Sequence, residues 1–282
     1  MTDLRESRLR PLYAIRMAKR YLELHLLLVV GSNMSKNYVI IGGSSDVALS
    51  YIKHINDISA GSDKASVIAH YAHNDQGLKA LSDQCQNVDL YSLQADLTDE
   101  AAVDKLTDAI MERFDHVDYF LHFPALPFDY MRYKELDSQK IKQELDVQLF
   151  SFLNISKKLF PAMKKVADAR AVVMLTKYVA DPMPPKFMVS YVVTKYALLG
   201  AMKAAAAEFG GGKFMINGLS PVMMDTKFLC NMDPHIIEMN KAQSPIGRII
   251  KPEEIVPYID KLLSADCDFN GTNLSMEEED FD

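Results

Sequence analysis

The chain has 282 residues, of which 49% are hydrophobic and 24% are charged, so it is long enough to bury a large core. Its formal net charge of -7 argues against a general electrostatic grip on nucleic acid or anionic lipid, and favours a small-molecule substrate. The three cysteines, Cys85, Cys230 and Cys267, are widely spaced and form no zinc or disulfide pattern. We therefore expect no metal site and a cytoplasmic location.

The first 33 residues differ in composition from the rest of the chain. Basic residues up to Arg20 precede a short apolar run at 26–30, which superficially resembles a signal peptide. Glu23 and His25 interrupt the apolar stretch, which is too short to span a bilayer, so we expect no membrane partner. We interpret 1–33 as an over-long gene start or an accessory helix, 34–275 as one functional domain, and 276–282 as a solvated acidic tail.

From residue 37 onward, β-branched runs alternate with amphipathic stretches, as in repeated βαβ units. This pattern predicts an α/β fold, a Rossmann-type doubly wound parallel sheet of six to seven strands with helices on both faces. In such a sheet, dinucleotides bind in the crevice at the carboxyl ends of the strands. The predicted strands are 38–41, 66–71, 88–94, 119–123, 171–175, 214–219 and 272–274.

The first predicted strand runs into a turn of small residues and then into a helical pattern. Gly42, Ser44 and Ser45 lie in this turn, and Asp46 and Val47 follow it. A strand, a tight turn and a helix N-terminus together present N–H groups and a positive dipole end to a pyrophosphate. Taken alone, an ordinary turn explains these residues about as well, with Asp46 as the helix N-cap.

A second candidate site has the spacing YxxxK. Tyr191 and Lys195 are four residues apart, which puts the phenol and the ammonium on one face of a helix. A neighbouring cation favours phenolate, and so lowers the phenol pKa towards the range useful for proton transfer. Tyr130 and Lys134 have the same spacing, but only Tyr191 follows the fifth predicted strand and opens a long helix.

In their order and spacing, these pieces resemble the short-chain dehydrogenase/reductase family, and within it the 3-oxoacyl-acyl-carrier-protein reductases. Gly42 matches the first glycine of the family's TGxxxGxG loop, whereas Asp46 and Ala48 replace the other two. The family's NNAG segment corresponds to 122–125, and its helix asparagine corresponds to Gln148. The resemblance implies catalytic roles for Tyr191 as proton donor, Lys195 as its partner, Thr176 as the carbonyl-orienting hydroxyl and Gln148 as the holder of a relay water.

The resemblance also implies a nicotinamide dinucleotide. Tyr71 stands where NAD-dependent relatives have an acidic residue, so we favour NADP(H) over NAD(H), with His73, Ser44 and Ser45 as candidates for the 2′-phosphate. Asp96 and Leu97 resemble the adenine-contacting segment, although Asp96 or Thr98 could instead cap the next helix. The full set of expected cofactor-binding residues is Gly42, Ser44, Ser45, Asp46, Val47, Tyr71, His73, Asp96, Leu97, Phe123, Pro124, Lys195, Pro221 and Thr226.

On this basis we expect an oxidoreductase that transfers hydride between the cofactor and a carbonyl/alcohol substrate. The Met-rich segment 221–239 corresponds to the family's substrate lid, although its apolar side chains could equally pack against the core. We expect a homodimer or homotetramer, because the helix that Tyr191 opens resembles the family's dimer-forming helix. The alternative function is a non-catalytic dinucleotide-binding or regulatory protein, since four family motifs depart from the usual residues.

Overall fold

The computed structural model describes residues 35–61, 64–180, 183–244 and 246–276. The predicted extension 1–33 lies outside these residues, as does the acidic tail after Met276, so the domain boundaries stay a prediction. The chain divides into two units, and the unit Met1–Ser35 with Gly61–Asp63 has few described residues. Everything below concerns the other unit, Lys36–Ala60 with Lys64–Asp282.

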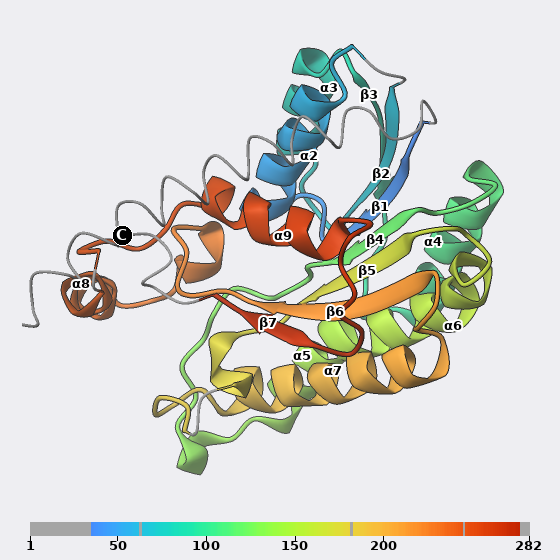
Figure 1. The fold of residues 1–282 in the computed structure, drawn as a ribbon. Helices are drawn as coiled ribbons and strands as arrows, with labels where there is room; N and C mark the ends of the chain where they lie inside the picture. The colour runs from blue at the N-terminus through green and yellow to red at the C-terminus, as the bar shows by residue number, and fades with distance from the viewer. Residues whose placement is uncertain (1–34, 62–63, 181–182, 245, 277–282) are drawn as a thin grey trace, which may run out of the picture. The chain divides into compact units, whose positions relative to one another are not determined.

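A seven-stranded parallel sheet forms the centre of this unit, in the order β3-β2-β1-β4-β5-β6-β7 (Figure 1). The strand order reverses between β1 and β4, which is where a doubly wound sheet opens a crevice. The predicted fold class is therefore confirmed. The strands are β1 (Asn37–Ile41), β2 (Ala65–Tyr71), β3 (Val88–Gln94), β4 (Tyr119–His122), β5 (Ala169–Met174), β6 (Phe214–Ser220) and β7 (Asn273–Ser275).

Helices cover both faces of the sheet (Figure 1). Those on one face are α2 (Asp46–Ile58), α3 (Gln76–Gln84) and α9 (Val256–Leu263). Those on the other are α4 (Glu100–Arg113), α5 (Ser138–Leu145), α6 (Ser151–Met163) and α7 (Val189–Glu208). α8 (Pro234–Gln243) follows β6. Short helical turns are η1 (Tyr133–Glu135), η2 (Asp146–Phe150), η3 (Lys177–Val179), η4 (Lys227–Leu229) and η5 (Pro252–Ile255).

Both faces of the central strands are apolar and buried, which explains why these strands appear in the sequence as continuous hydrophobic runs. Val39, Phe120 and Val173 pack beneath α4, α6 and α7, whereas Ile40 and Leu121 pack on the α2 and α9 side. Among the described residues, no helix is long and apolar enough to cross a membrane.

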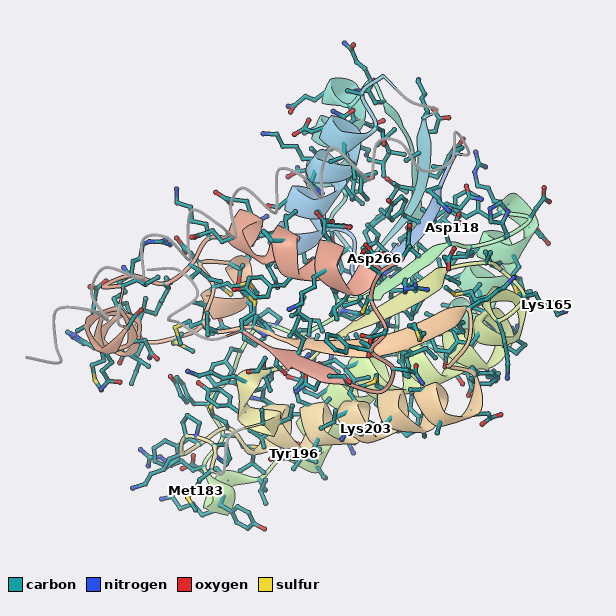
Figure 2. The ribbon with its side chains drawn as sticks, viewed as in Figure 1. Asp118, Lys165, Met183, Tyr196, Lys203 and Asp266 are labelled. Carbon is teal, nitrogen blue, oxygen red and sulfur yellow. The ribbon has the colours of Figure 1, made fainter. Side chains whose placement is uncertain are left out.

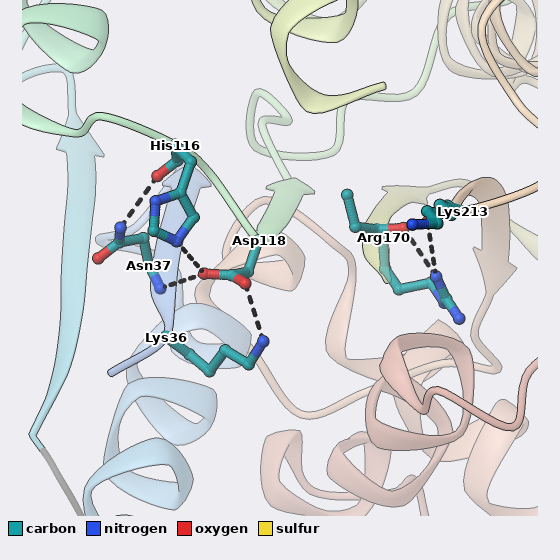
Figure 3. A network of polar contacts seen from close by, with 7 residues as sticks. Lys36, Asn37, His116, Asp118, Arg170 and Lys213 are labelled. Atoms are coloured by element: carbon teal, nitrogen blue, oxygen red, sulfur yellow. Dashed lines mark hydrogen bonds and ion pairs between the residues drawn. The ribbon is translucent and has the colours of Figure 1, made fainter. Parts of the chain in front are cut away.

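Polar contacts join the amino ends of β1 and β4, and a second group joins those of β5 and β6 (Figure 3). The buried Asp118 carboxylate accepts hydrogen bonds from the backbone N–H of Asn37 and from the Lys36 ammonium, both at 2.9 Å. Arg170, 2% exposed, donates to the carbonyl oxygens of Ala169, Lys213, Ser264 and Ala265. These contacts fix one end of the sheet, and the candidate site lies at the other.

Candidate active site

The turn between β1 and α2 has the geometry expected of a phosphate loop. Gly42 has φ +78, a left-handed conformation, and the N–H of Gly43 donates to the carbonyl of His70 at 2.7 Å. Ser45 is the N-cap of α2, since its hydroxyl accepts from the N–H of Ala48 at 3.3 Å. The sequence-based alternative that Asp46 caps this helix is wrong, because Asp46 is already its first residue.

Close backbone approach requires glycine at both positions of the turn. A Cβ on Gly42 would lie 2.9 Å from the nitrogen of Pro124, and one on Gly43 would lie 2.7 Å from the Cβ of Ala69. Phe123 and Pro124 follow β4, and the N–H of Phe123 donates to the carbonyl of Ile41 at 2.9 Å. The structure therefore brings the turn and the predicted segment 123–124 together at the point where the strand order reverses.

His70, at the end of β2, supports this turn and was not among the expected site residues. Its Nδ1 accepts the N–H of Gly42 at 3.2 Å, and its Nε2 lies 3.0 Å from the carbonyl of Ala95. The ring must therefore be neutral and carry its proton on Nε2, and burial lowers its pKa in agreement with this. The sequence offered one signal for this role, since His70 directly precedes Tyr71, an expected cofactor-binding residue.

Asp46 points its carboxylate towards the lid segment. Its Oδ2 accepts the backbone N–H of Lys227 at 2.7 Å, and its Oδ1 lies 3.3 Å from the Lys227 ammonium. The expected cofactor residues Pro221 and Thr226 belong to this segment, and Thr226 directly precedes η4. The residue that replaces the family's second glycine therefore links the phosphate loop to the lid.

The adenosine side of the predicted site lies at the ends of β2 and β3. Tyr71 is partly buried against the core, and His73 is exposed. Asp96 accepts hydrogen bonds from the N–H and hydroxyl of Thr98, which lower its pKa, while Leu97 is buried. The alternative that Asp96 or Thr98 caps α4 is wrong, because Asp99 is the N-cap.

A dinucleotide phosphate fits the first turn of α2. Within the described part of the chain, the N–H groups of Asp46 and Val47 have no hydrogen-bond partner, as expected for the first turn of a helix. These donors and the small side chains of Ser44 and Ser45 suit an anion. Among the residues of this first turn, the Asp46 carboxylate opposes anion binding, because it carries a negative charge. No cluster suited to a metal ion occurs within the described ranges.

Tyr191 and Lys195 lie in the first two turns of α7, beside the end of β5. The side chain of Thr176, just after β5, lies near the Tyr191 phenol and acts to lower its pKa. Lys195 is 2% exposed, donates to the carbonyl of Met174 at 2.8 Å, and has its Nζ 5.8 Å from the centre of the Tyr191 ring. Three of the four predicted catalytic side chains therefore meet at the carboxyl end of the sheet.

Burial dominates the proton affinities of this pair. It raises the pKa of Tyr191, against the lowering effect of Thr176, and it lowers the pKa of Lys195 to about 8. The Lys195 ammonium donates to the carbonyl of Met174, and its lowering effect on the phenol pKa stays a prediction. The phenol is held neutral, the form that can donate a proton to a carbonyl oxygen.

Gln148 lies behind this pair, in the π-helical turn η2 between α5 and α6. Its side chain is fully buried and donates to the Glu144 carboxylate one turn earlier. Its backbone carbonyl lies 2.8 Å from Nε2 of His122, the residue at the first NNAG position. Gln148 is therefore hydrogen-bonded to Glu144 through its side chain and lies next to His122 through its backbone carbonyl. Turns with π-helical geometry are frequent at functional sites.

An aromatic cluster covers the phenol. The Phe128 and Phe228 rings lie 5.9 Å and 5.5 Å from the Tyr191 ring, and the N–H of Phe128 donates to the carbonyl of Phe228 at 2.9 Å. Leu229 and Met232 of the lid segment pack into the same buried cluster, whereas Met239 is exposed. Much of the lid therefore packs against the protein, as the alternative interpretation of its methionines expected.

Comparison with known proteins gives a consistent result. A family model described as enoyl-(acyl carrier protein) reductase matches residues 59–276. An uncharacterized oxidoreductase of Bacillus subtilis is 23% identical over 84% of this chain and 94% of its own length. The 3-oxoacyl-(acyl-carrier-protein) reductase of Aquifex aeolicus is 24% identical over 70% and 74%. A short-chain dehydrogenase of Penicillium roqueforti is 25% identical, over 58% of this chain and 65% of its own length.

Among solved structures, a short-chain dehydrogenase from Burkholderia cenocepacia in complex with NADP superposes with a TM-score of 0.75. It is 18% identical, and the match covers 88% of this chain and 98% of the other, which shows the shared fold. The chain belongs to the short-chain dehydrogenase/reductase family of nicotinamide-dependent oxidoreductases. The predicted family and the predicted oxidoreductase class are thereby confirmed.

Proposed function

We propose that the protein is an NADP(H)-dependent reductase of a carbonyl compound, with the reverse oxidation of the alcohol as the same reaction run backwards. The observation that carries this proposal is the convergence of Tyr191, Thr176 and Lys195 at the carboxyl end of the sheet, next to the phosphate loop side of the crevice. A neutral phenol beside a hydroxyl is the arrangement required to protonate a developing alkoxide.

Each residue has a distinct role in this proposal. Tyr191 donates its proton to the substrate oxygen, while the Thr176 hydroxyl orients that oxygen. Lys195 makes one hydrogen bond to Met174, and its remaining N–H groups would hold the cofactor ribose and stabilise negative charge on Tyr191. The nicotinamide, when bound, supplies or accepts the hydride.

The preference for NADP(H) rests on the end of β2. Tyr71 carries no charge that would repel a 2′-phosphate, and the exposed His73 lies at the same edge. Of the acids that follow β2 and β3, Asp75 pairs with the Lys79 ammonium at 2.9 Å, and Asp96 accepts two hydrogen bonds from Thr98. The phosphate loop residues Gly42, Ser44, Ser45, Asp46 and Val47, the segments Leu97 and Phe123–Pro124, and the lid residues Pro221 and Thr226 complete the proposed cofactor site.

A small pocket lies beside Tyr178. Its lining is mixed: the apolar side chains are Val222, Met223, Ile246, Ile249 and Ile250, and the polar ones include Lys177, Asn240 and Ser244. Such a lining suits a substrate group with both apolar and polar parts. Arg248 also borders the pocket but is held by Glu254 at 2.7 Å, which agrees with the structural role predicted for this arginine.

The test is a nucleotide titration followed by a carbonyl screen that includes 3-oxoacyl thioesters, using the full chain and the variant Tyr191→Phe. NADPH should bind both proteins, and turnover should fall by about a hundredfold or more in the variant, because a general acid typically contributes a factor of that size. Tyr130→Phe is the matched control, since Tyr130 and Lys134 share the YxxxK spacing but are solvent-exposed residues outside the pair.

Binding of NADPH without turnover of any carbonyl compound would favour the alternative function, a dinucleotide-binding or regulatory protein. If neither NADPH nor NADH binds, the proposed cofactor and the proposed reaction are both wrong.

We also propose that two copies of this chain associate through α6 and α7. Apolar side chains are exposed on both helices and on η2 next to them, namely Phe150, Leu153, Val193 and Tyr196. Tyr196 and Lys203 lie along α7 (Figure 2). Light scattering should give a mass of about twice 31.8 kDa, or a higher even multiple, and Tyr196→Glu should reduce it. The cytoplasmic location stays a prediction.

A further inference from the structure

Two neighbouring residues of the short turn η4 are held by different parts of the chain. The N–H of Phe128, after β4, donates to the carbonyl of Phe228 at 2.9 Å, and the Phe228 ring lies 5.5 Å from the Tyr191 ring. One residue earlier, the N–H of Lys227 donates to the Asp46 carboxylate at 2.7 Å. The turn that carries Phe228 is therefore attached both to the segment after β4 and to the phosphate loop.

Asp46 makes two contacts with Lys227, and the hydrogen bond to the backbone is the stronger. A hydrogen bond from an N–H group to an ionised carboxylate is about twice as strong as one between neutral groups. The ion pair, at 3.3 Å, involves an ammonium whose side chain is 81% exposed, so solvent screens it. Because the stronger contact is made to the backbone, it fixes the path of the turn and not merely one side chain.

In the described part of the chain, the Asp46 carboxylate is the acceptor that this N–H group has. Lys227 is the first residue of η4, where a backbone N–H has no partner within the turn, and Thr226 before it makes no side-chain cap. The chain just upstream is held elsewhere, since the N–H of Asp225 donates to the carbonyl of Ile250 at 2.8 Å. Asp46 continues this attachment up to the residue that precedes Phe228.

The position of Phe228 matters because its ring closes one side of the Tyr191 phenol. The Phe128 ring, 1% exposed, lies 5.9 Å from the Phe228 ring, and Leu229 packs into the same buried cluster. Tyr191 is the proton donor of the proposed reaction, and exclusion of water strengthens the electrostatic interactions of such a group. A displaced turn would admit water to the phenol.

We propose that Asp46 is a positioning residue that acts through η4: by accepting the N–H of Lys227, its carboxylate holds the Phe228 ring against Tyr191. This role gives a reason for an acid at the phosphate loop, where its charge opposes an anion. The consequence for turnover rests on the proposed function, whereas the position of the ring can be measured without cofactor or substrate.

The chain contains no tryptophan, so Phe228→Trp gives the full-length protein a single fluorescent reporter on η4. In this background, Asp46→Ala should shift the emission to longer wavelength and increase quenching by acrylamide, because losing a hydrogen bond to a charged group shifts such an equilibrium by about tenfold or more. Asp46→Asn should restore most of the original signal, since its amide oxygen can still accept the N–H. Lys227→Met, which removes only the screened ion pair, should have a small effect.

Asp57→Ala is the matched control, because it removes the same charge from an exposed position at the other end of α2 and should change nothing. Amide hydrogen exchange gives a second measurement that needs no reporter, should Phe228→Trp fail to fold. The Phe128 amide should exchange faster in Asp46→Ala than in Asp46→Asn. This amide is the informative one, because neither substitution alters its acceptor, the Phe228 carbonyl.

If the reductase proposal holds, Asp46→Ala should lower kcat/KM for the carbonyl compound by about tenfold at saturating NADPH, and Asp46→Asn should recover most of this loss. In a Phe228→Leu background the same Asp46→Ala change should cost little, because no ring remains to be positioned.

Unchanged tryptophan emission and unchanged Phe128 exchange in Asp46→Ala overturn the inference, even if the wild type turns over. Equal effects of Asp46→Asn and Asp46→Ala also overturn it, because the charge rather than the hydrogen bond would then be responsible. Absence of turnover in the wild type overturns the proposed function and leaves the fluorescence and exchange results standing.

Discussion

Asp46 should weaken cofactor binding, because it places a carboxylate at the first residue of α2. A phosphate charge about 6 Å from this carboxylate would be repelled by about 1 kcal/mol at an effective dielectric constant of about 50. The Lys227 ammonium, 3.3 Å away, offsets part of this, but its side chain is 81% exposed and is therefore well screened by solvent. The net penalty is about 0.5–1 kcal/mol, which is roughly a two- to fivefold loss in affinity.

The variant Asp46→Asn removes this charge while its amide oxygen can still accept the N–H of Lys227, which now lies 2.7 Å from Oδ2. We expect the Kd for NADPH, measured by fluorescence titration, to fall about two- to fivefold. The gain should shrink in about 1 M salt, where the screening length is only about 3 Å. Asp57→Asn, which removes a charge from the other end of α2, is the control.

Equal or weaker binding by Asp46→Asn, or a gain that is independent of salt, would show that the carboxylate does not act on the phosphates electrostatically. In that case the contacts of Asp46 with Lys227 would instead support cofactor binding, by holding the lid segment in place.

Two predictions concern stability. Arg170→Met should lower the free energy of unfolding by about 3 kcal/mol or more, because several buried carbonyl oxygens lose a charged hydrogen-bond donor. Urea denaturation measures this free energy. A loss well below this value would mean that water takes the place of the guanidinium. Lys140→Met, which breaks an exposed ion pair, is its control. Burial lowers the pKa of His122 to about 3, so the unfolded state binds more protons below about pH 6.5 and stability should fall as the pH falls towards 3. His122→Asn should lessen this fall between pH 6 and 5, and equal slopes for the two proteins would contradict it.

Much of the fold could be predicted from the sequence because each strand is marked by a local run of apolar and β-branched residues. The seven predicted strands are all present, with ends displaced by up to two residues, because hydrogen bonds with neighbouring strands decide where pairing stops. β5 begins at Ala169 rather than at 171, since Arg170 pairs with Tyr119 although its side chain is charged. A charged residue at a strand end carries no local signal that its side chain will be buried.

His70 shows where prediction from the sequence stopped. It is a titratable residue in a strand pattern, for which a simple packing role is the ordinary expectation. Its importance comes from partners far along the chain, the N–H of Gly42 and the carbonyl of Ala95. Asp46 likewise meets Lys227, which is 181 residues away.

The amino-acid sequence by itself determined the alternation of strands and helices, the small-residue turn at Gly42, and the i, i+4 pairing of Tyr191 with Lys195, because these depend on local periodicity and helix geometry. Only the tertiary structure decided which charges are buried together, that the Lys195 ammonium is directed to Met174, and that Asp46 holds the lid segment. The physical reason is that desolvation and charge pairing depend on three-dimensional distance, which residue spacing fixes only within a single helix or strand.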